Sequence, residues 1–340
     1  MIDIFDKELV VNPHRLVGRE EIVPVRDMAP FVALAEVDAG IPLEQTAYYA
    51  MFKDRGSSNA DARRDVTAFL KKREDIQKRR EIGNVSIRID DQGRLVLAQG
   101  YESAAIAASL EMEKIKVDVA SRSDKWIDLV NRLYDVRHQR YSYMPILQPE
   151  EHPEFATWKF SRGPARAKII AEDAGDLTGQ RWLDVGSLTG YHTRMLDVAG
   201  AEAFGIEMHQ PYAEIAAMLN TIQGTDAAFY NQELRAWLQD NQQQRFDGIV
   251  CLSIIHNIAQ SGDPEGAKRA FRALSEMAPK MYFDIGQAQE GTQVTRTGLD
   301  LREENLAVFV RENSRYRCIE PIGRDNDYHG RVLFKLSLEE

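Results

Sequence analysis

The chain has 340 residues, with 44% hydrophobic and 28% charged side chains and a formal net charge of −10. The composition is that of a globular protein, and the length suits two hydrophobic cores, because single cores stop growing at roughly 250–300 residues. No stretch approaches the ~20 apolar residues of a membrane span, and the acidic N-terminus is unlike a secretory signal, so we expect a cytoplasmic protein without a membrane partner. The negative charge makes nucleic acid an unfavourable partner and favours a small substrate.

The cysteines and the other metal-binding residue types give two further expectations. Cys251 and Cys318 each lie in an apolar, strand-like run, which favours buried free thiols over a disulfide. No cluster of His, Cys or Asp has the spacing of a metal site, so we predict none, although residues far apart in the sequence could still assemble one.

The first third of the chain predicts a small α+β domain. Residues 1–55 are apolar enough to fold, but their pattern does not distinguish helix from strand. After residue 56, helical spacing gives way to alternating strand patterns around a turn at Asp91-Gln92-Gly93. In chain order we expect a helix over 56–82, a hairpin of strands 85–90 and 95–97, a helix over 103–110 and a strand over 115–119.

A charged run from Lys71 to Arg80 covers the outer face of the predicted helix over 56–82. Such a run could bind phosphate. However, Glu74 and Asp75 stand four residues before Lys78 and Arg79, the spacing of side chains that pair along a helix. We therefore favour internal pairing on a solvated face.

The boundary between two domains is expected near residues 140–155. A charged helix is predicted from residue 123 to about residue 140, and the prolines at 145 and 149 then forbid regular helix. We predict an N-terminal domain over 1–122, a helical linker over 123–154 and a second domain over 155–340.

The second domain alternates strand-like runs with helical patterns, which implies parallel strands joined by crossover helices. We expect a Rossmann-like, doubly wound and mostly parallel sheet. Its last two strands are separated only by a loop, so the sheet should close with an antiparallel hairpin. The predicted parallel strands lie at 181–185, 203–206, 227–230, 248–252 and 281–285, and the hairpin strands at 316–320 and 331–336.

One strand runs into a glycine-bearing turn and then a helix, in the segment Trp182 to Tyr191. Glycines there let backbone amides approach a ligand, and Glu207, which ends the next strand about 20 residues on, would reach ribose hydroxyls. Asp184 precedes Gly186 by two residues, where an acid suits the sulfonium and ammonium groups of S-adenosyl-L-methionine. Leu188 lies where a dinucleotide fold has a glycine, so a pyrophosphate would be poorly held.

This segment resembles motif I of class I methyltransferases, in the form Asp-x-Gly-Ser-x-x-Gly-Tyr. The run 246–256 resembles motif IV, and the terminal hairpin resembles the sixth and seventh strands of that family. The resemblance implies S-adenosyl-L-methionine as cofactor. Arg162 and Arg166 stand four residues apart, and one of them could meet the cofactor carboxylate, because a guanidinium suits bidentate pairing; ion pairs with the acidic surface are the alternative. The cofactor-binding residues that we expect are Asp184, Gly186, Ser187, Gly190, Tyr191, Glu207, Met208, Asn231, Gln232, Ser253 and Arg162.

His256 is the residue that we expect to be catalytic. It follows the fourth strand at the carboxyl edge of the sheet, where a histidine could take a proton from an acceptor hydroxyl. The alternative is a helix-start histidine or cofactor neighbour with no role in proton transfer. His209 and Arg166 could line the cofactor site, and Asp284 could contact substrate or a metal ion.

The N-terminal domain resembles the core of ParB/sulfiredoxin-like domains through its strand order, Gly100 and the helix that follows. That family reads nucleotide phosphate with Gly-x-His-Arg, whereas this chain has Gly100-Tyr101-Glu102-Ser103. A structural or substrate-covering role is therefore expected of this degenerate domain. Some sugar-cluster methyltransferases carry such a fusion, which suggests a sugar hydroxyl as acceptor.

We therefore expect an enzyme that methylates a small-molecule acceptor, by O-methylation of a sugar or related metabolite. Two alternatives remain. A tRNA-type RNA methyltransferase would use the helix around residues 71–80 to hold RNA, and a non-catalytic assembly protein would bind the cofactor without turnover. Homo-oligomerisation is compatible with all three.

Overall fold

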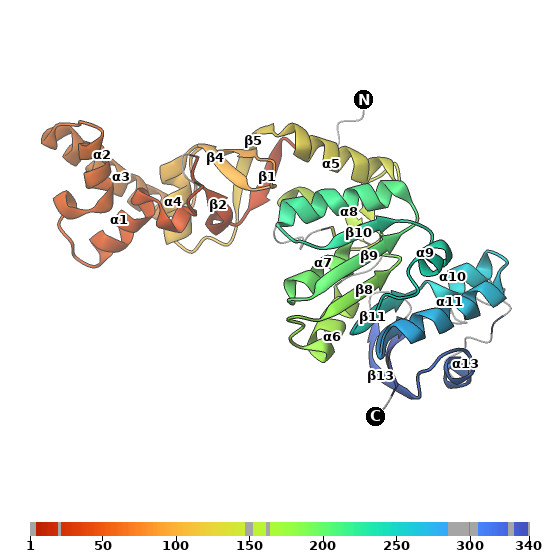
Figure 1. The fold of residues 1–340 in the computed structure, drawn as a ribbon. Helices are drawn as coiled ribbons and strands as arrows, with labels where there is room; N and C mark the ends of the chain where they lie inside the picture. The colour runs from red at the N-terminus through yellow and green to blue at the C-terminus, as the bar shows by residue number, and fades with distance from the viewer. Residues whose placement is uncertain are drawn as a thin grey trace. The chain divides into compact units, whose positions relative to one another are not determined.

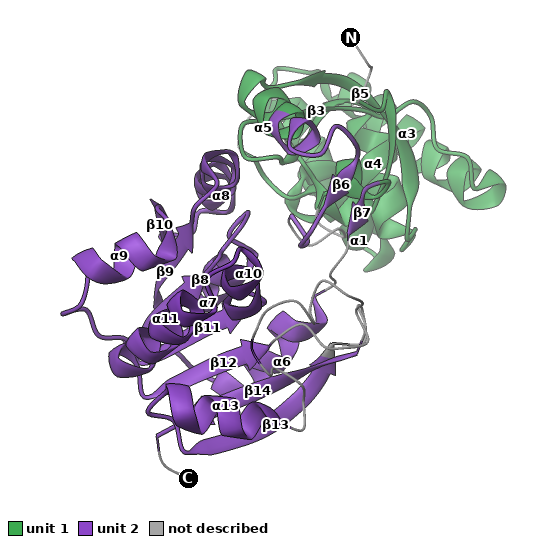
Figure 2. Cartoon of the chain, turned by 90° about the vertical axis from the view of Figure 1, so that its right-hand side faces the viewer, with its two compact units in different colours: residues 1–131, 149–157 green, residues 132–148, 158–340 purple. Residues whose placement is uncertain are grey.

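The computed structural model describes residues 5–19, 22–146, 152–160, 164–284, 299, 305–325 and 330–338. The chain divides into two compact units (Figure 2). Unit 1 comprises residues 1–131 and 149–157, and unit 2 comprises residues 132–148 and 158–340. The segment predicted as a linker over 123–154 is thus divided between the two units, and the chain returns to unit 1 before unit 2 is completed.

Unit 1 is built around a five-stranded sheet of order β1-β5-β3-β4-β2 (Figure 1). The predicted hairpin is confirmed, because β3 and β4 pair antiparallel. The described part of residues 1–55, for which the sequence predicts no element type, contributes two strands, two α-helices and three short 3₁₀ helices. The elements are β1 (Glu8–Val11), η1 (Pro13–Arg15), β2 (Leu16–Val17), η2 (Val25–Asp27), α1 (Ala29–Asp38), η3 (Leu43–Gln45), α2 (Ala47–Asp54), α3 (Asn59–Arg79), β3 (Ser86–Ile89), β4 (Leu95–Gln99), α4 (Tyr101–Ser109), β5 (Ile115–Arg122), the start of α5 (Asp124–Asp135) and η4 (Pro153–Phe155).

Helix α3 confirms the expected long helix but ends three residues early. The Ser58 hydroxyl accepts a hydrogen bond from the Asp61 N–H at the N-terminus, and Arg80 takes a left-handed conformation that terminates the helix. The internal ion pairs predicted for the charged run are not formed. Instead, Lys72 pairs with Glu102 of α4 at 3.1 Å and Arg73 pairs with Asp38 of α1 at 2.6 Å. The run therefore joins α3 to two other helices.

The segment 152–157 packs into unit 1 through a buried carboxylate. Glu154 is 3% exposed, and it accepts hydrogen bonds from Trp126 Nε1 and from Arg122 Nε, both at 2.6 Å. His152 stacks on the Trp126 ring with 5.1 Å between ring centroids. Burial lowers the pKa of His152 to about 4. These contacts explain why the chain returns to unit 1 at this point.

Unit 2 contains a seven-stranded sheet of order β10-β9-β8-β11-β12-β14-β13. The first five strands are parallel, and β14 pairs antiparallel with both β12 and β13. The predicted mostly parallel sheet with a terminal hairpin is confirmed. The elements are β6 (Tyr141–Ser142), β7 (Lys159–Phe160), α6 (Ala165–Ala174), β8 (Arg181–Val185), α7 (Tyr191–Val198), β9 (Glu202–Glu207), α8 (Gln210–Gln223), β10 (Ala228–Asn231), α9 (Leu234–Asp240), β11 (Gly248–Leu252), α10 (Ile255–Gln260), α11 (Pro264–Met277), β12 (Lys280–Asp284), α13 (Leu306–Asn313), β13 (Cys318–Asp325) and β14 (Arg331–Ser337).

The sheet of unit 2 is buried between two hydrophobic layers (Figure 1). Successive side chains of a strand point to opposite faces, so Leu183 packs in the layer that contains α9, α11 and α13, while Trp182 packs in the layer of α6 and α7. Gly248 lies beneath the Trp182 ring, where a Cβ atom would come within 2.4 Å of it. Both predicted thiols are free: Cys251 is buried and Cys318 is half-buried.

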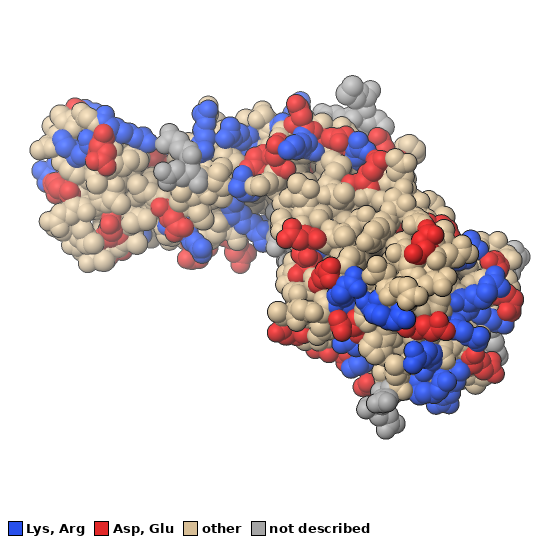
Figure 3. Space-filling model, viewed as in Figure 1, with Lys and Arg blue, Asp and Glu red and all other residues tan. Residues whose placement is uncertain are grey.

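Within the described residues, no helix is long and apolar enough to cross a membrane. The same part of the chain holds no group of three or more His, Cys, Asp or Glu side chains arranged to bind a metal ion. Basic and acidic side chains are interspersed over the face seen in Figure 3.

Candidate active site

The glycine turn connects β8 to α7 at the carboxyl end of the sheet. Gly186 and Gly190 have φ angles of 72° and 75°, in the left-handed region that favours glycine. A Cβ at Gly186 would lie 2.1 Å from the Ile254 side chain, and one at Gly190 would lie 2.5 Å from the Phe229 ring. Backbone conformation and close packing therefore both require these two glycines.

The turn is tied to the neighbouring strand β9 by backbone hydrogen bonds. The N–H groups of Gly186 and Ser187 both donate to the carbonyl of Ile206 at 2.9 Å. Leu188 has a φ of 49°, which is unusual for a branched residue. The Leu188 N–H donates a hydrogen bond to Glu207 Oε2 at 3.0 Å. In this left-handed conformation Leu188 is therefore hydrogen-bonded to Glu207, the acid that ends β9.

Glu207 ends β9 and is only 4% exposed. Besides Leu188 N–H, it accepts a hydrogen bond from the His209 N–H, whose nitrogen lies 2.8 Å from Oε1. Two backbone donors thus fix the orientation of the carboxylate at the edge of the sheet. Each carboxylate oxygen can accept more than one hydrogen bond, so Glu207 keeps capacity for the hydroxyls of a ligand.

Asp184 lies beneath the turn and is 3% exposed. Its Oδ2 accepts a hydrogen bond from the Thr193 hydroxyl at 2.7 Å. Burial raises the pKa of Asp184 to about 6, although the bond from Thr193 opposes that shift. Thr193 was not singled out from the sequence, because a threonine in the first turn of a helix has no distinguishing pattern.

The residues after β9 and β10 surround Glu207. The Asn231 side-chain amide donates to the carbonyl of Glu207 at 2.9 Å, and the Gln232 N–H donates to the same oxygen at 3.1 Å. Both residues therefore hold the backbone of Glu207. Met208 is 58% exposed and Tyr230 is 40% exposed, so large apolar side chains remain accessible at this edge.

A second polar cluster occupies the carboxyl ends of β11 and β12. Asp284 is fully buried, and its two oxygens accept hydrogen bonds from Arg166 Nη1 at 2.6 Å and from the Ser253 hydroxyl at 3.0 Å. Arg331 Nη1 donates to the Ser253 hydroxyl at 2.6 Å. Ser253 and Arg166 are therefore engaged with Asp284, and Arg162 lies outside the described residues.

His256 is the second residue of α10, directly beyond the carboxyl end of β11, and it is 4% exposed. Tyr191 begins α7 after the glycine turn and is also buried. The turn of residues 186–190, Tyr191 and Glu207 thus form one connected group. Ser253 belongs instead to the cluster around Asp284.

Arg194 holds three separate segments together, and sequence reasoning missed it. Its guanidinium donates to the Thr189 carbonyl at 2.5 Å, to Gln223 Oε1 at 2.5 Å and to the Ile146 carbonyl at 2.9 Å. The side chain is 3% exposed, and burial lowers its pKa to about 9. The glycine turn is thereby joined to α8 and to the segment that contains Ile146.

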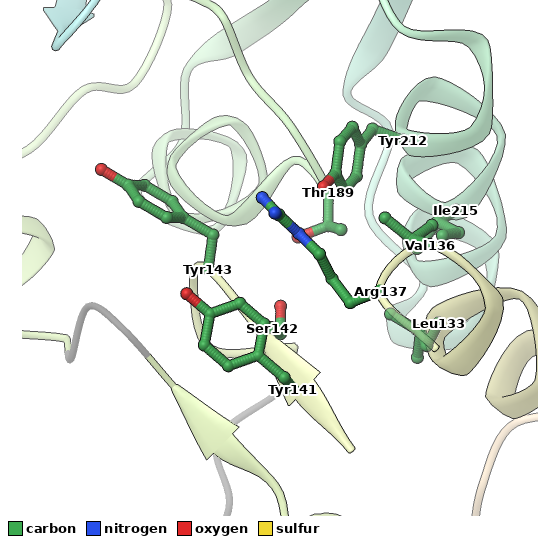
Figure 4. A pocket seen from close by; sticks show the side chains of 9 residues that line it. All are labelled: Leu133, Val136, Arg137, Tyr141, Ser142, Tyr143, Thr189, Tyr212 and Ile215. Atoms are coloured by element: carbon green, nitrogen blue, oxygen red, sulfur yellow. The ribbon is translucent and has the colours of Figure 1, made fainter. Parts of the chain in front are cut away.

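A small cavity of about 10 Å³, roughly the space of one water molecule, opens beside Thr189 (Figure 4). Its walls come from the C-terminal end of α5, the segment around β6, the glycine turn and α8, all within unit 2. The lining residues are Leu133, Val136, Arg137, Tyr141, Ser142, Tyr143, Thr189, Tyr212 and Ile215.

No family model matches the chain. Ubiquinone biosynthesis O-methyltransferase of Bordetella bronchiseptica is 28% identical over 120 residues, which cover 35% of this chain and 48% of the relative. The enzyme of the same name from Alkalilimnicola ehrlichii is 31% identical over 120 residues, covering 35% of this chain and 47% of the relative. The chain spans about half the length of the curated relatives that it matches.

A solved structure of the kinase-methyltransferase WbdD, crystallised with a kinase inhibitor, is similar over 62% of this chain and 48% of that protein. The TM-score is 0.52 and the sequence identity is 17%. At that identity the likeness is evidence of fold. Over this part of its length the chain therefore shares the Rossmann-like fold of that protein.

Proposed function

We propose that unit 2 transfers the methyl group of S-adenosyl-L-methionine to a hydroxyl oxygen of a small-molecule acceptor. The observation that carries this proposal is Glu207, a buried carboxylate oriented by the N–H groups of Leu188 and His209 beside a glycine turn. A carboxylate at this position of a doubly wound fold is suited to paired ribose hydroxyls. The O-methyltransferase names of the curated relatives support oxygen as the methylated atom.

The residues of the turn fit this cofactor. Ser187 lies in the turn and is 6% exposed, and its hydroxyl has no hydrogen-bond partner among the described residues. The exposed Met208 offers an apolar surface to the adenine. We assign cofactor binding to Asp184, Gly186, Ser187, Gly190, Tyr191, Glu207, Met208, Asn231, Gln232 and Ser253, with Arg162 retained as a candidate for the carboxylate.

When bound, the cofactor supplies an electrophilic methyl group on a sulfonium. The protein must then orient the acceptor oxygen, exclude water and accept the hydroxyl proton. We assign proton acceptance to His256, at the carboxyl end of β11. Arg166, Asp284 and Ser253 form a buried hydrogen-bonded cluster at the same edge of the sheet.

A sugar or related metabolite is the proposed acceptor. This rests on the resemblance of unit 1 to the ParB/sulfiredoxin-like domains that are fused to some sugar-cluster methyltransferases. Glu102 occupies the place of a basic residue in that family's phosphate-reading stretch, and it accepts hydrogen bonds from Tyr48 at 2.8 Å and Lys72 at 3.1 Å. A carboxylate there disfavours phosphate, so we assign unit 1 a structural or substrate-covering role.

Calorimetry with S-adenosylhomocysteine tests the cofactor site. Glu207→Ala should weaken binding about tenfold or more, because it removes hydrogen bonds to a charged acceptor. Glu202→Ala is the matched control, since Glu202 begins the same strand and is exposed. Equal affinity in both variants would disprove the assignment. Cofactor binding without methyl transfer to any hydroxylated metabolite would favour the non-catalytic alternative.

A further inference from the structure

Ser253, the residue that follows β11, has a left-handed backbone and a buried side chain. Its φ angle is 65°, in the region that favours glycine, and the residue is 9% exposed. A serine keeps this conformation only where the surrounding structure imposes it, and such residues cluster at functional sites. Strand β11 pairs with β8, the strand that leads into the glycine turn. Ser253 therefore lies at the same edge of the sheet as the turn.

Each polar group of Ser253 is hydrogen-bonded within the protein. The hydroxyl donates to Asp284 Oδ1 at 3.0 Å and accepts from Arg331 Nη1 at 2.6 Å. The backbone carbonyl accepts from the Asn257 side-chain amide at 2.7 Å, and the N–H donates to the Asp284 carbonyl at 3.4 Å. A hydroxyl has a single proton to donate. Ser253 therefore has no donor left for a ligand, and its hydrogen bonds hold its backbone in place.

The next side chain, Ile254, packs against the glycine turn. A Cβ atom at Gly186 would lie 2.1 Å from Ile254 Cδ1 and 2.9 Å from Ile254 Cγ1, so the isoleucine fills the space that a side chain at Gly186 would need. Gly186 is also tied to β9, because its N–H donates to the carbonyl of Ile206 at 2.9 Å. Protein interiors are packed so closely that a shift on one side of such a contact is felt on the other. The position of Gly186 therefore depends on that of Ile254.

We propose that Ser253 is a positioning residue for the cofactor site, acting through Ile254. The hydroxyl bonds keep the backbone of Ser253 left-handed, and that backbone keeps Ile254 packed on Gly186. This rests on the proposed function, in which the glycine turn holds S-adenosyl-L-methionine. The part that Ser253 plays in cofactor binding is then indirect. Ser253 links the buried cluster around Asp284 to the turn at the end of β8.

Two substitutions separate the backbone of Ser253 from its hydroxyl. Ser253→Ala removes the hydroxyl bonds and leaves a residue that disfavours the left-handed region, so Ile254 should shift and the affinity for S-adenosylhomocysteine should fall about tenfold. Ser253→Gly removes the same bonds but adopts the conformation without strain, so its affinity should stay within about threefold of the wild type. Calorimetry on the full chain measures both affinities.

The same pair of substitutions at Glu111 is the matched control. Glu111 also has a left-handed backbone, with a φ angle of 50°, but it is exposed and lies in unit 1. Glu111→Ala and Glu111→Gly should differ in thermal stability because of the backbone, yet both should bind S-adenosylhomocysteine as the wild type does. Melting curves of all variants show that each one is folded at the temperature of the binding measurement.

Ile254→Ala tests whether Ser253 acts through Ile254. This variant should itself bind S-adenosylhomocysteine more weakly. Adding Ser253→Ala to it should weaken binding little further, because the side chain that Ser253 positions has already been removed. A Ser253 that only stabilised the fold would lower the melting temperature without this dependence on Ile254.

Equal losses of affinity in Ser253→Ala and Ser253→Gly would overturn the inference, since cofactor binding would then depend on the hydroxyl and not on the backbone conformation. Unchanged affinity in Ser253→Ala would overturn it too, as would a double variant in which the losses from Ser253→Ala and Ile254→Ala simply add. Failure of the proposed function appears separately, as absence of S-adenosylhomocysteine binding by the unmodified chain.

Discussion

Arg194 donates a hydrogen bond to the backbone carbonyl of Thr189, at the centre of the glycine turn, from a side chain that is itself buried. The same guanidinium reaches Gln223 and the carbonyl of Ile146. A planar group with five N–H donors can serve three acceptors that diverge in direction, whereas an ammonium cannot hold them in the same geometry. The shape of the turn thus depends on a residue outside motif I.

We predict that Arg194→Lys will destabilise the protein by about 2–4 kcal/mol, because buried carbonyls and a buried charge lose their partners. Chemical denaturation measures this change. Arg235→Lys is the control, since Arg235 forms ion pairs that are partly exposed to solvent. The variant should also bind S-adenosylhomocysteine more weakly. Wild-type stability in Arg194→Lys would show that the turn does not depend on this contact.

The raised pKa of Asp184 predicts how stability depends on pH. Folding raises the pKa from an ordinary 3.8 to about 6, so between these values the folded state binds more protons than the unfolded state. Stability therefore falls as pH rises through this window and stays lower above it. Asp184→Asn removes that penalty while keeping an acceptor for Thr193. The variant should gain roughly 1–3 kcal/mol relative to the wild type between pH 4 and pH 7.

Urea denaturation at several pH values measures this difference. The free energy of unfolding of the wild type and that of Asp184→Asn are each plotted against pH, and the difference between the two curves is taken. Both proteins share the other titrating groups, so the contributions of those groups largely cancel. A constant difference across the range would mean that Asp184 remains charged at little cost in the folded protein. That result would contradict the burial of the carboxylate beneath the turn.

Removing the charge of Asp284 should have a large effect, because its oxygens accept hydrogen bonds from Arg166 and Ser253 in a fully buried position. We predict that Asp284→Asn will cost about 3–5 kcal/mol, the range for leaving a buried charge uncompensated. Adding Arg166→Met to this variant should recover part of the loss, since the uncompensated guanidinium is then removed. Thermal and chemical unfolding of the two single variants and the double variant measure the coupling.

A cost below about 1 kcal/mol for Asp284→Asn would contradict this account. So would a double variant whose loss equals the sum of the single losses, because that result would show no coupling between the two side chains.

The sequence predicted the elements of unit 2 well because each has its own local signal. Strands β8 and β11 begin and end where the apolar runs do. The turn at Gly186 is recognisable because its conformation requires glycine, which gives it a sequence motif. The sequence does not predict in the same way which distant residues a buried polar side chain contacts. Arg194 and Asp284 find their partners across long stretches of chain, and a polar residue on a helix or at a strand end gives no sign of which distant group it will meet.

Unit 1 was harder to predict for a related reason. Glu154 belongs to a proline-containing connector, and its position depends on Trp126, which precedes it by 28 residues. Periodicity cannot reveal a segment that returns to an earlier unit. The sequence predicts the boundary from prolines that interrupt the helix, whereas in the structure buried contacts determine it.

His256 is the remaining prediction. If His256 accepts the proton of the acceptor hydroxyl, His256→Gln should lower turnover by about 10²-fold or more while leaving the affinity for S-adenosylhomocysteine nearly unchanged, because a general base acts on the transition state. A base must be neutral to act, so wild-type turnover should fall in acid, and the residual turnover of the variant should lose that dependence. His14→Gln is the control, since His14 belongs to unit 1.

Steady-state kinetics over a range of pH, with calorimetry on the same samples, separates chemistry from binding. Near-normal turnover in His256→Gln would make this residue a neighbour of the site only, and the base would then be sought at His209 or dispensed with, since the sulfonium is itself a reactive donor.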